Sequence, residues 1–304
     1  MNVFRHTPYD GSKQPFSIGL EPVAPAAWFD PDGHLIAHLD QKARLLAERR
    51  DVVFRAEPET GAAQAEVLRM LVAHLSEAHP TRYRRAGDAV IVTGAQGATD
   101  RRVALDADEP PLLTASRLVQ EDLVIMRKGE GGYRLAAASL CFPSSWSLAE
   151  KFGQPMAAIH TKVPGFAGRM GQVVDRIFDN LKPDQLVGRL NWSIYDDADL
   201  HHPEPKQLTP QIEADGASAL AALFVRVERQ TLRRLPDSGD VLFTIKIHHD
   251  PIRALEDHPR RAELAAGLLT QLLALDVDQL AYKGLTRHRD RIAAALQAFA
   301  AAPA

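Results

Sequence analysis

The chain has 304 residues, of which 45% are hydrophobic and 25% are charged, an ordinary composition for a soluble globular protein. A net charge of −3 and the lack of a Lys/Arg block interleaved with aromatic residues argue against a nucleic-acid partner. The single cysteine excludes an internal disulfide, and it excludes an iron–sulfur cluster or a thiolate zinc site held by this chain alone.

The first 33 residues are rich in proline, which predicts an extended N-terminal arm anchored in the core by Trp28 and Phe29. They lack the basic and apolar regions of a signal peptide, and no apolar run approaches the ~20 residues of a membrane span. We therefore expect a cytoplasmic protein with no membrane contact. Apolar residues at helical spacing then predict helices over 35–48 and 63–77.

Short apolar runs predict the next elements as strands, over 89–93, 103–105, 123–128 and 133–140. The glycine-rich residues 129–132 join the last two as a hairpin loop. No helix follows this loop, and neither G-x-G-x-x-G nor the P-loop pattern occurs in the sequence. A Rossmann-type flavin or nicotinamide site is therefore not expected.

The stretch from Cys141 to Phe166, CFPSSWSLAEKFGQPMAAIHTKVPGF, concentrates unusual residues between a strand and a helix. The spacing of Ser147 and Glu150 predicts a short helix over 148–152, and Pro155 begins a predicted extended run over 156–159. His160 follows, where an apolar segment meets an irregular loop. This position suits a metal ligand, and it equally suits a structural histidine bonded to a carbonyl. Cys141, flanked by Leu140 and Phe142, fits a buried small hydrophobe better than a nucleophile.

The second half begins with a predicted helix over 167–180 and a strand over 187–195. Alternation over 223–232 and 241–249 predicts a hairpin whose pairing places Arg226 and Glu228 opposite 247–249. The last predicted elements are helices over 262–275, 279–283 and 289–300. We expect one domain over 1–304, with 1–33 as the arm and 250–304 as a helical C-terminal region.

Two groups of residues suggest chemistry without deciding it. His248 and Asp250 have the H-x-D spacing of non-haem iron oxygenases, with His258 or His288 as the third ligand, but such spacing also arises where polar residues end an edge strand. The charged residues between Arg226 and Arg234 are either a solvated strand face or paired charges around a pocket.

Three stretches in fixed order carry a resemblance to a known family. They are the stretch from Cys141 to Phe166, RLNWSIY at 189–195, and VRVERQTLRRLPDSGDVLFTIKI at 225–247. In these stretches the chain resembles the haem-dependent oxidative N-demethylase family, formerly a domain of unknown function. The resemblance extends, more weakly, over most of the chain.

The resemblance implies an α+β fold, with a PAS-like antiparallel sheet flanked by helices and a helical C-terminal region. It implies a haem b protein that uses O2 to demethylate a small secondary amine such as dimethylamine, releasing formaldehyde. Electrons would come from NADPH through partner subunits carrying FMN and an iron–sulfur cluster, with tetrahydrofolate associated with the complex. A lone cysteine and the lack of a dinucleotide motif agree with an external reductase. The alternatives are a PAS-like haem sensor and a non-haem iron oxygenase that uses His248 and Asp250.

The resemblance also suggests roles for particular residues. His160 is our choice for the axial haem ligand, with its second ring nitrogen held by a backbone carbonyl, and His248 and His249 are its rivals. Glu228 would hold the protonated amine or relay protons, with Arg229 as the second catalytic candidate. The remaining cofactor-binding candidates are Lys162 and Arg226, which with Arg229 would pair with haem propionates, and Asn191 and Trp192, which would line the pocket.

Overall fold

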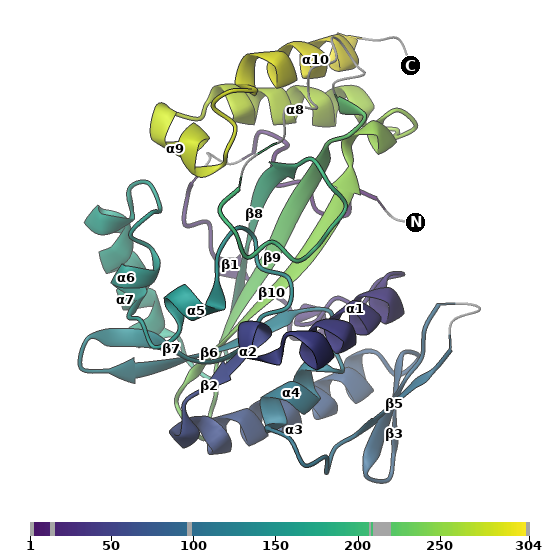
Figure 1. Cartoon of the computed structure of the whole chain (residues 1–304), viewed down its shortest axis with the longest axis vertical. Helices are drawn as coiled ribbons and strands as arrows, with labels where there is room; N and C mark the ends of the chain where they lie inside the picture. Colours follow the sequence, from purple (N-terminus) through teal and green to yellow (C-terminus); the bar gives the residue numbers. More distant parts are fainter. Residues whose placement is uncertain (1–2, 13–15, 96–98, 207, 209–219, 302–304) are drawn as a thin grey trace.

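A seven-stranded antiparallel sheet forms the centre of the computed structural model, which describes residues 3–12, 16–95, 99–206, 208 and 220–301 (Figure 1). The strands lie in the order β1-β8-β9-β10-β6-β7-β2. Their bounds are β1 Glu21–Pro22, β2 Phe54–Ala56, β6 Asp122–Gly129, β7 Gly132–Ser139, β8 Leu186–Tyr195, β9 Phe224–Arg234 and β10 Val241–Pro251. The predicted α+β class is confirmed.

The β9–β10 hairpin is the longest paired unit of the sheet, and its register is the predicted one. Glu228 lies opposite Ile247, and Arg226 lies opposite His249. Because directly opposed residues of antiparallel strands share a face, even-numbered residues of β9 share a face with odd-numbered residues of β8 and β10. This alternation divides the charged run of β9 between the two faces of the sheet.

Helices cover the two faces of the sheet differently (Figure 1). One face packs at one end against α1, α3 and α4, and at the other end against α8 and α10. The other face lies under α5, α6 and α7. The bounds are α1 Leu35–Glu48, α2 Arg50–Val53, α3 Gly61–Ala78, α4 Pro111–Ser116, α5 Leu148–Lys151, α6 Met156–Ile159, α7 Gly171–Asn180, α8 Arg261–Leu273, α9 Val277–Tyr282 and α10 Arg289–Ala301.

Several shorter elements complete the described fold. A three-stranded antiparallel sheet consists of β3 Tyr83–Ala86, β4 Ala89–Val92 and β5 Arg101–Ala104, and it shares a core with α1 and α3. The 3₁₀ turns are η1 Pro25–Ala27, η2 Pro58–Thr60 and η5 Ile252–Leu255, and η3 is a π-helical turn over Phe166–Met170. No helix in the described part of the chain has the length and apolarity needed to cross a membrane.

The N-terminal arm is anchored as predicted, because Trp28 and Phe29 are fully buried. The guanidinium of Arg233 lies over the Trp28 ring, 4.3 Å from its centroid. One local prediction is wrong: residues 156–159 form the single helical turn α6, not an extended run. Pro155, a residue that favours the start of a helix, precedes Ala157 and Ala158, which are strong helix formers, and local propensity prevails.

Candidate functional site

A cavity of about 1210 Å³ lies between the sheet and the layer formed by α5, α6 and α7. It exceeds the ~300–1,000 Å³ of most small-molecule sites. Residues from three separate parts of the sequence close it: Phe16 and Leu20 from the N-terminal arm, the segment from α6 to α7, and Tyr282 with Lys283 at the end of α9. A large ligand can therefore be enclosed on several sides.

The floor of this cavity is one face of the sheet and has an apolar half and a polar half. The apolar half comes from β6, β7 and β10 with one residue of β9, and consists of Val124, Met126, Leu135, Leu232, Phe243 and Ile245. The polar half comes from β8 and β9, where Arg189 lies opposite Gln230 and Asn191 lies opposite Glu228. A ligand that fits must be largely apolar, with polar groups at one end.

His160 lies in the wall opposite the floor, directly after α6. Its Nδ1 is 2.9 Å from the carbonyl oxygen of Met156, which can only accept, so Nδ1 carries the hydrogen. The ring stacks on Phe166 with centroids 4.2 Å apart, which fixes its plane. Burial lowers the pKa of His160 to about 4, so the imidazole is neutral at pH 7. Among the described residues, none donates to Nε2, whose lone pair is therefore available to a ligand in the cavity.

The polar end of the cavity carries three cations that no described carboxylate pairs within 4 Å. Lys206 Nζ donates to Ser193 Oγ at 3.1 Å, and Lys283 Nζ donates to the carbonyl of Trp192. Burial lowers the pKa of Lys283 to about 8 and lowers the pKa of Lys206 well below its usual value. Arg189 is partly buried, and its Nε, which is fully buried, has no hydrogen-bond partner in the described structure. This end of the cavity therefore favours an anionic group.

Glu228 is a carboxylate that interacts electrostatically with this cationic end. Its negative charge raises the pKa of Lys283 and of Arg189, and so partly offsets the lowering caused by burial. Gln230 Nε2 donates to its Oε2 at 2.6 Å, which fixes the carboxylate against the polar floor. Asn191 lies directly across on β8. Glu228, Asn191, His160 and Lys162 thus all line the same cavity, and their roles in a haem site remain a prediction.

The sequence model of the family described as haem-dependent oxidative N-demethylase, alpha subunit-like, matches residues 19–293. The chain belongs to this family. The match confirms the resemblance, and the family name indicates a haem-dependent oxidoreductase that works as one subunit of a complex.

The haem of the N-demethylase family is a planar, mostly apolar molecule with an iron that needs an axial ligand and with two carboxylates. The cavity offers an apolar floor, a neutral imidazole with a free Nε2, and three cations at the polar end. Metal-bound histidines commonly donate their second N–H to a backbone carbonyl, as His160 does here. The residues present therefore fit the cofactor.

Two arginines expected in the site lie elsewhere. Arg229 projects from the opposite face of β9 to Glu228, and its guanidinium donates to the carbonyls of Ala27 and Trp28. Arg226 shares a face with Glu228 but lies beyond the cavity, fully buried, and donates to the carbonyls of Phe142 and Leu200 at 2.9 Å each. Arg229 lies on the opposite face because successive residues of β9 alternate between the two faces of the sheet. The N–H groups of Arg226 are already engaged with backbone carbonyls, which leaves few of them to bind a haem carboxylate.

Trp192 and the rival histidines also lie outside the large cavity. Trp192 follows Asn191 on β8, so its side chain points to the opposite face of the strand, and it lines a smaller cavity of about 270 Å³. His249 Nε2 bonds to the carbonyl of Asp197 at 2.8 Å, and its ring stacks on Phe224. His248 lies on the face opposite the large cavity.

The H-x-D pair of β10 does not form the predicted three-ligand site. Asp250 accepts a hydrogen bond from the backbone of Phe4 at 3.1 Å, and the histidine nearest to His248 is His6, not His258 or His288.

Sequence reasoning missed Arg189, Lys206 and Lys283. Arg189 had a signal, because it lies two residues before Asn191 on β8 and therefore on the same face of the strand. The two lysines had none, since tertiary packing alone brings the loop after β8 and the end of α9 to the cavity.

Proposed function

We propose that this chain is the haem b-binding catalytic subunit of an enzyme that demethylates a small secondary amine, such as dimethylamine. The observation that carries the proposal is His160, whose Nε2 lone pair is open to the large cavity while the Met156 carbonyl holds Nδ1–H. Overall, the amine, O2, two electrons and two protons would give the demethylated amine, formaldehyde and water.

The chain would hold the cofactor at two points. His160 would ligate the iron through Nε2, and the cations Arg189, Lys206 and Lys283 would receive the two carboxylates, in place of the Arg226 and Arg229 expected from the sequence. Placing anions beside these cations would offset the desolvation that lowers their pKa values. When bound, haem supplies the activation of O2 and the oxidation of the N-methyl group.

Glu228 would orient the substrate. Gln230 fixes Oε2, which leaves Oε1 to accept a hydrogen bond from a protonated amine. Asn191, directly opposite, offers a second polar contact. A carboxylate in this position can also hold and return a proton, so one residue would both bind the amine and move a proton.

Electrons must reach this subunit from outside, since the chain has one cysteine and no dinucleotide-binding motif. We propose partner subunits with FMN and an iron–sulfur cluster that take electrons from NADPH, with tetrahydrofolate associated with the complex. We propose that the complex works in the cytoplasm, where NADPH would supply its electrons.

The test is the absorption spectrum of the purified protein, oxidised and dithionite-reduced, beside His160→Ala and the control His249→Ala. We expect a Soret band in the parent and in the control, and its loss or shift in His160→Ala. Amine-dependent formaldehyde release with a supplied reductase would follow. A parent without a Soret band after growth with ample haem precursor contradicts the proposal, and haem without turnover of any small secondary amine favours the sensor alternative.

A further inference from the structure

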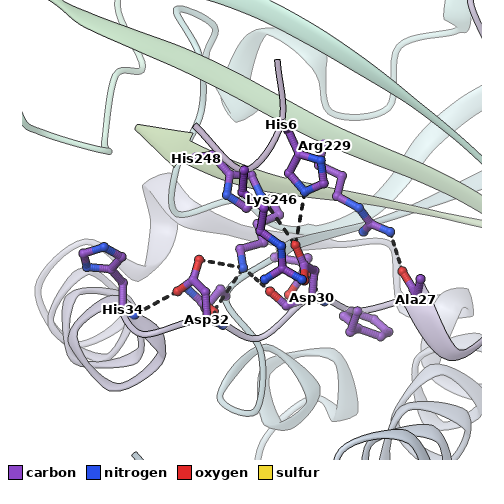
Figure 2. A network of polar contacts seen from close by, with 12 residues as sticks. His6, Ala27, Asp30, Asp32, His34, Arg229, Lys246 and His248 are labelled. Atoms are coloured by element: carbon purple, nitrogen blue, oxygen red, sulfur yellow. Dashed lines mark hydrogen bonds and ion pairs between the residues drawn. The ribbon is translucent and has the colours of Figure 1, made fainter. Parts of the chain in front are cut away.

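A second group of potential metal ligands lies on the face of the sheet opposite the large cavity (Figure 2). It consists of His6 from the N-terminal arm, Asp30 from the segment before α1, and His248 from β10. One ligand atom of each residue lies within 4.8 Å of the others. Three elements distant in sequence therefore bring two imidazoles and one carboxylate together.

The distances in this cluster are close to those of a metal site. His6 Nε2 is 3.2 Å, and His248 Nε2 is 3.8 Å, from Asp30 Oδ2. Two ligands at about 2.1 Å from a tetrahedral ion lie roughly 3.4 Å apart. The two rings have centroids 4.6 Å apart at 65°, an arrangement in which both Nε2 atoms approach the same carboxylate oxygen. Only small side-chain shifts would bring all three atoms to an ion.

His248 Nε2 is the observation that points to a missing ligand. The residue is only 8% exposed, and this nitrogen is buried without a hydrogen-bond partner in the described structure. Leaving a buried polar atom unsatisfied costs about 1–3 kcal/mol, and such an atom often marks an ion.

The surrounding hydrogen bonds leave Asp30 Oδ2 available to a metal. Arg5 pairs with Oδ1, the other oxygen of this carboxylate. Lys246 Nζ donates to the Asp30 backbone carbonyl and pairs with Asp32 at 2.9 Å (Figure 2). Among the described residues, only His6 and His248 contact Asp30 Oδ2. The acidic groups around the cluster, which offset the charge of an added ion and of the nearby cations, are Asp30, Asp32, Glu121 and Asp250.

We propose that His6, Asp30 and His248 bind a first-row transition-metal dication, of which zinc is the representative probe. Two imidazoles and one carboxylate are ligands for zinc, iron(II) and cobalt(II), whereas magnesium and calcium prefer sites made of oxygen ligands only. The half-buried His6 provides access from solvent, and a water would complete the coordination. The site is separate from the proposed haem site, because the two lie on opposite faces of the sheet.

Such an ion would fasten the N-terminal arm to the sheet. His6 lies near the start of the arm, whereas Asp30, which follows the anchoring residues Trp28 and Phe29, and His248 on β10 are both buried. The peptide bond after Arg5 lies beside the ligand His6. Metal binding therefore predicts slower trypsin cleavage at Arg5 as well as greater thermal stability.

The experiment is calorimetric titration of the full-length chain with zinc chloride after dialysis against a chelator. We expect one zinc per chain in the parent and in the control His34→Gln, which removes an exposed imidazole near the cluster but outside it. His6→Gln and His248→Gln should each weaken zinc binding at least about tenfold. Zinc should raise the unfolding temperature and slow cleavage at Arg5 in the parent, and do neither in His6→Gln.

His6→Gln is the decisive variant because His6 is half-buried on the arm and its replacement does not threaten the core. A parent that binds no zinc overturns the proposal, and so does a His6→Gln protein with parental zinc affinity. Haem content and amine turnover are read separately, so failure here leaves the proposed function standing.

Discussion

Cys141 illustrates how burial removes reactivity from a residue that sequence alone singles out. It lies fully buried at the end of β7, and its backbone N–H donates to the carboxylate of Asp122 at 2.8 Å. Burial, reinforced by the charge of Asp122, raises the pKa of the thiol to about 12. The thiolate is the nucleophilic form, so this cysteine serves as packing and not as a nucleophile.

We predict that native Cys141 does not react with Ellman's reagent at pH 8, and that one equivalent reacts once the chain is denatured. Both the raised pKa and burial act against reaction, and this is the only cysteine, so the count is unambiguous. Stoichiometric reaction of the folded protein within minutes would contradict the buried placement.

The protonation of a single residue, Lys283, should make haem binding at the proposed site depend on pH. Burial lowers its pKa to about 8, so the charge is present below pH 8 and lost above it. A carboxylate bound beside Lys283 raises that pKa again, and binding therefore takes up a proton above pH 8. Haem affinity should accordingly fall as pH rises from 8 to 10, by up to about tenfold per pH unit for one lysine.

The measurement is a haem titration at pH 7, 8, 9 and 10. The Lys283→Met protein should bind haem more weakly at pH 7, and its haem affinity should vary less with pH. Lys162→Met is the matched control, because Lys162 lines the same cavity but is exposed. If Lys162→Met has the larger effect, the carboxylates lie at the other end of the cavity.

At the scale of elements, the close approach of the N-terminal arm to α8 depends on Gly267. A Cβ at this position would lie 2.6 Å from the carbonyl oxygen of Tyr9 and 2.9 Å from Asp10 Cα. These are backbone atoms, so the arm must move if the glycine is replaced. The arm also carries Phe16 and Leu20, which line the large cavity.

We predict that Gly267→Ala lowers the free energy of unfolding by about 1–3 kcal/mol, because overpacking displaces the arm. The control is Gly61→Ala at the start of α3, where a Cβ meets nothing within 4 Å and the backbone is helical. This control should be neutral or stabilising by up to about 1 kcal/mol. The measurement is the urea concentration at the unfolding midpoint of each variant. Equal midpoints for Gly267→Ala and Gly61→Ala would show that the arm is not tightly packed on α8.

The elements differ in how far the sequence predicts them. Alternation over β9 and β10 predicts both strands and their register, because period-two patterns report a half-buried sheet directly. β2 has three residues and α4 six, too short for a periodic pattern, and both form through tertiary contacts. Of the residues that line the large cavity, Glu228 was predictable from its position on a strand, and His160 from the family stretch that contains it. Lys206 and Lys283 were not, because folding of distant segments brings them together.

At the scale of the whole molecule, a cavity of about 1210 Å³ bounded by three separate parts of the sequence should couple cofactor binding to stability. Haem that binds only the folded chain stabilises it by about 2.7 kcal/mol at a free concentration of 100 times Kd. We predict a higher unfolding temperature for haem-loaded than for haem-free protein, with the increase lost in His160→Ala. Calorimetry of both forms measures it, and identical transitions would indicate that haem does not occupy this cavity.

The position of α9 also bears on when in the life of the chain its cofactor can be held. A polypeptide is made from its N-terminus, and the floor of the cavity is complete once β10 has been synthesised, yet Lys283 follows α9, more than 30 positions later. Until α9 and Lys283 have been synthesised, the cavity lacks one cation of its polar end and one of the segments that close it. Haem would therefore be acquired late in biogenesis, by a chain whose C-terminal helices have already docked, and a shortened chain ending at β10 would fail to retain it.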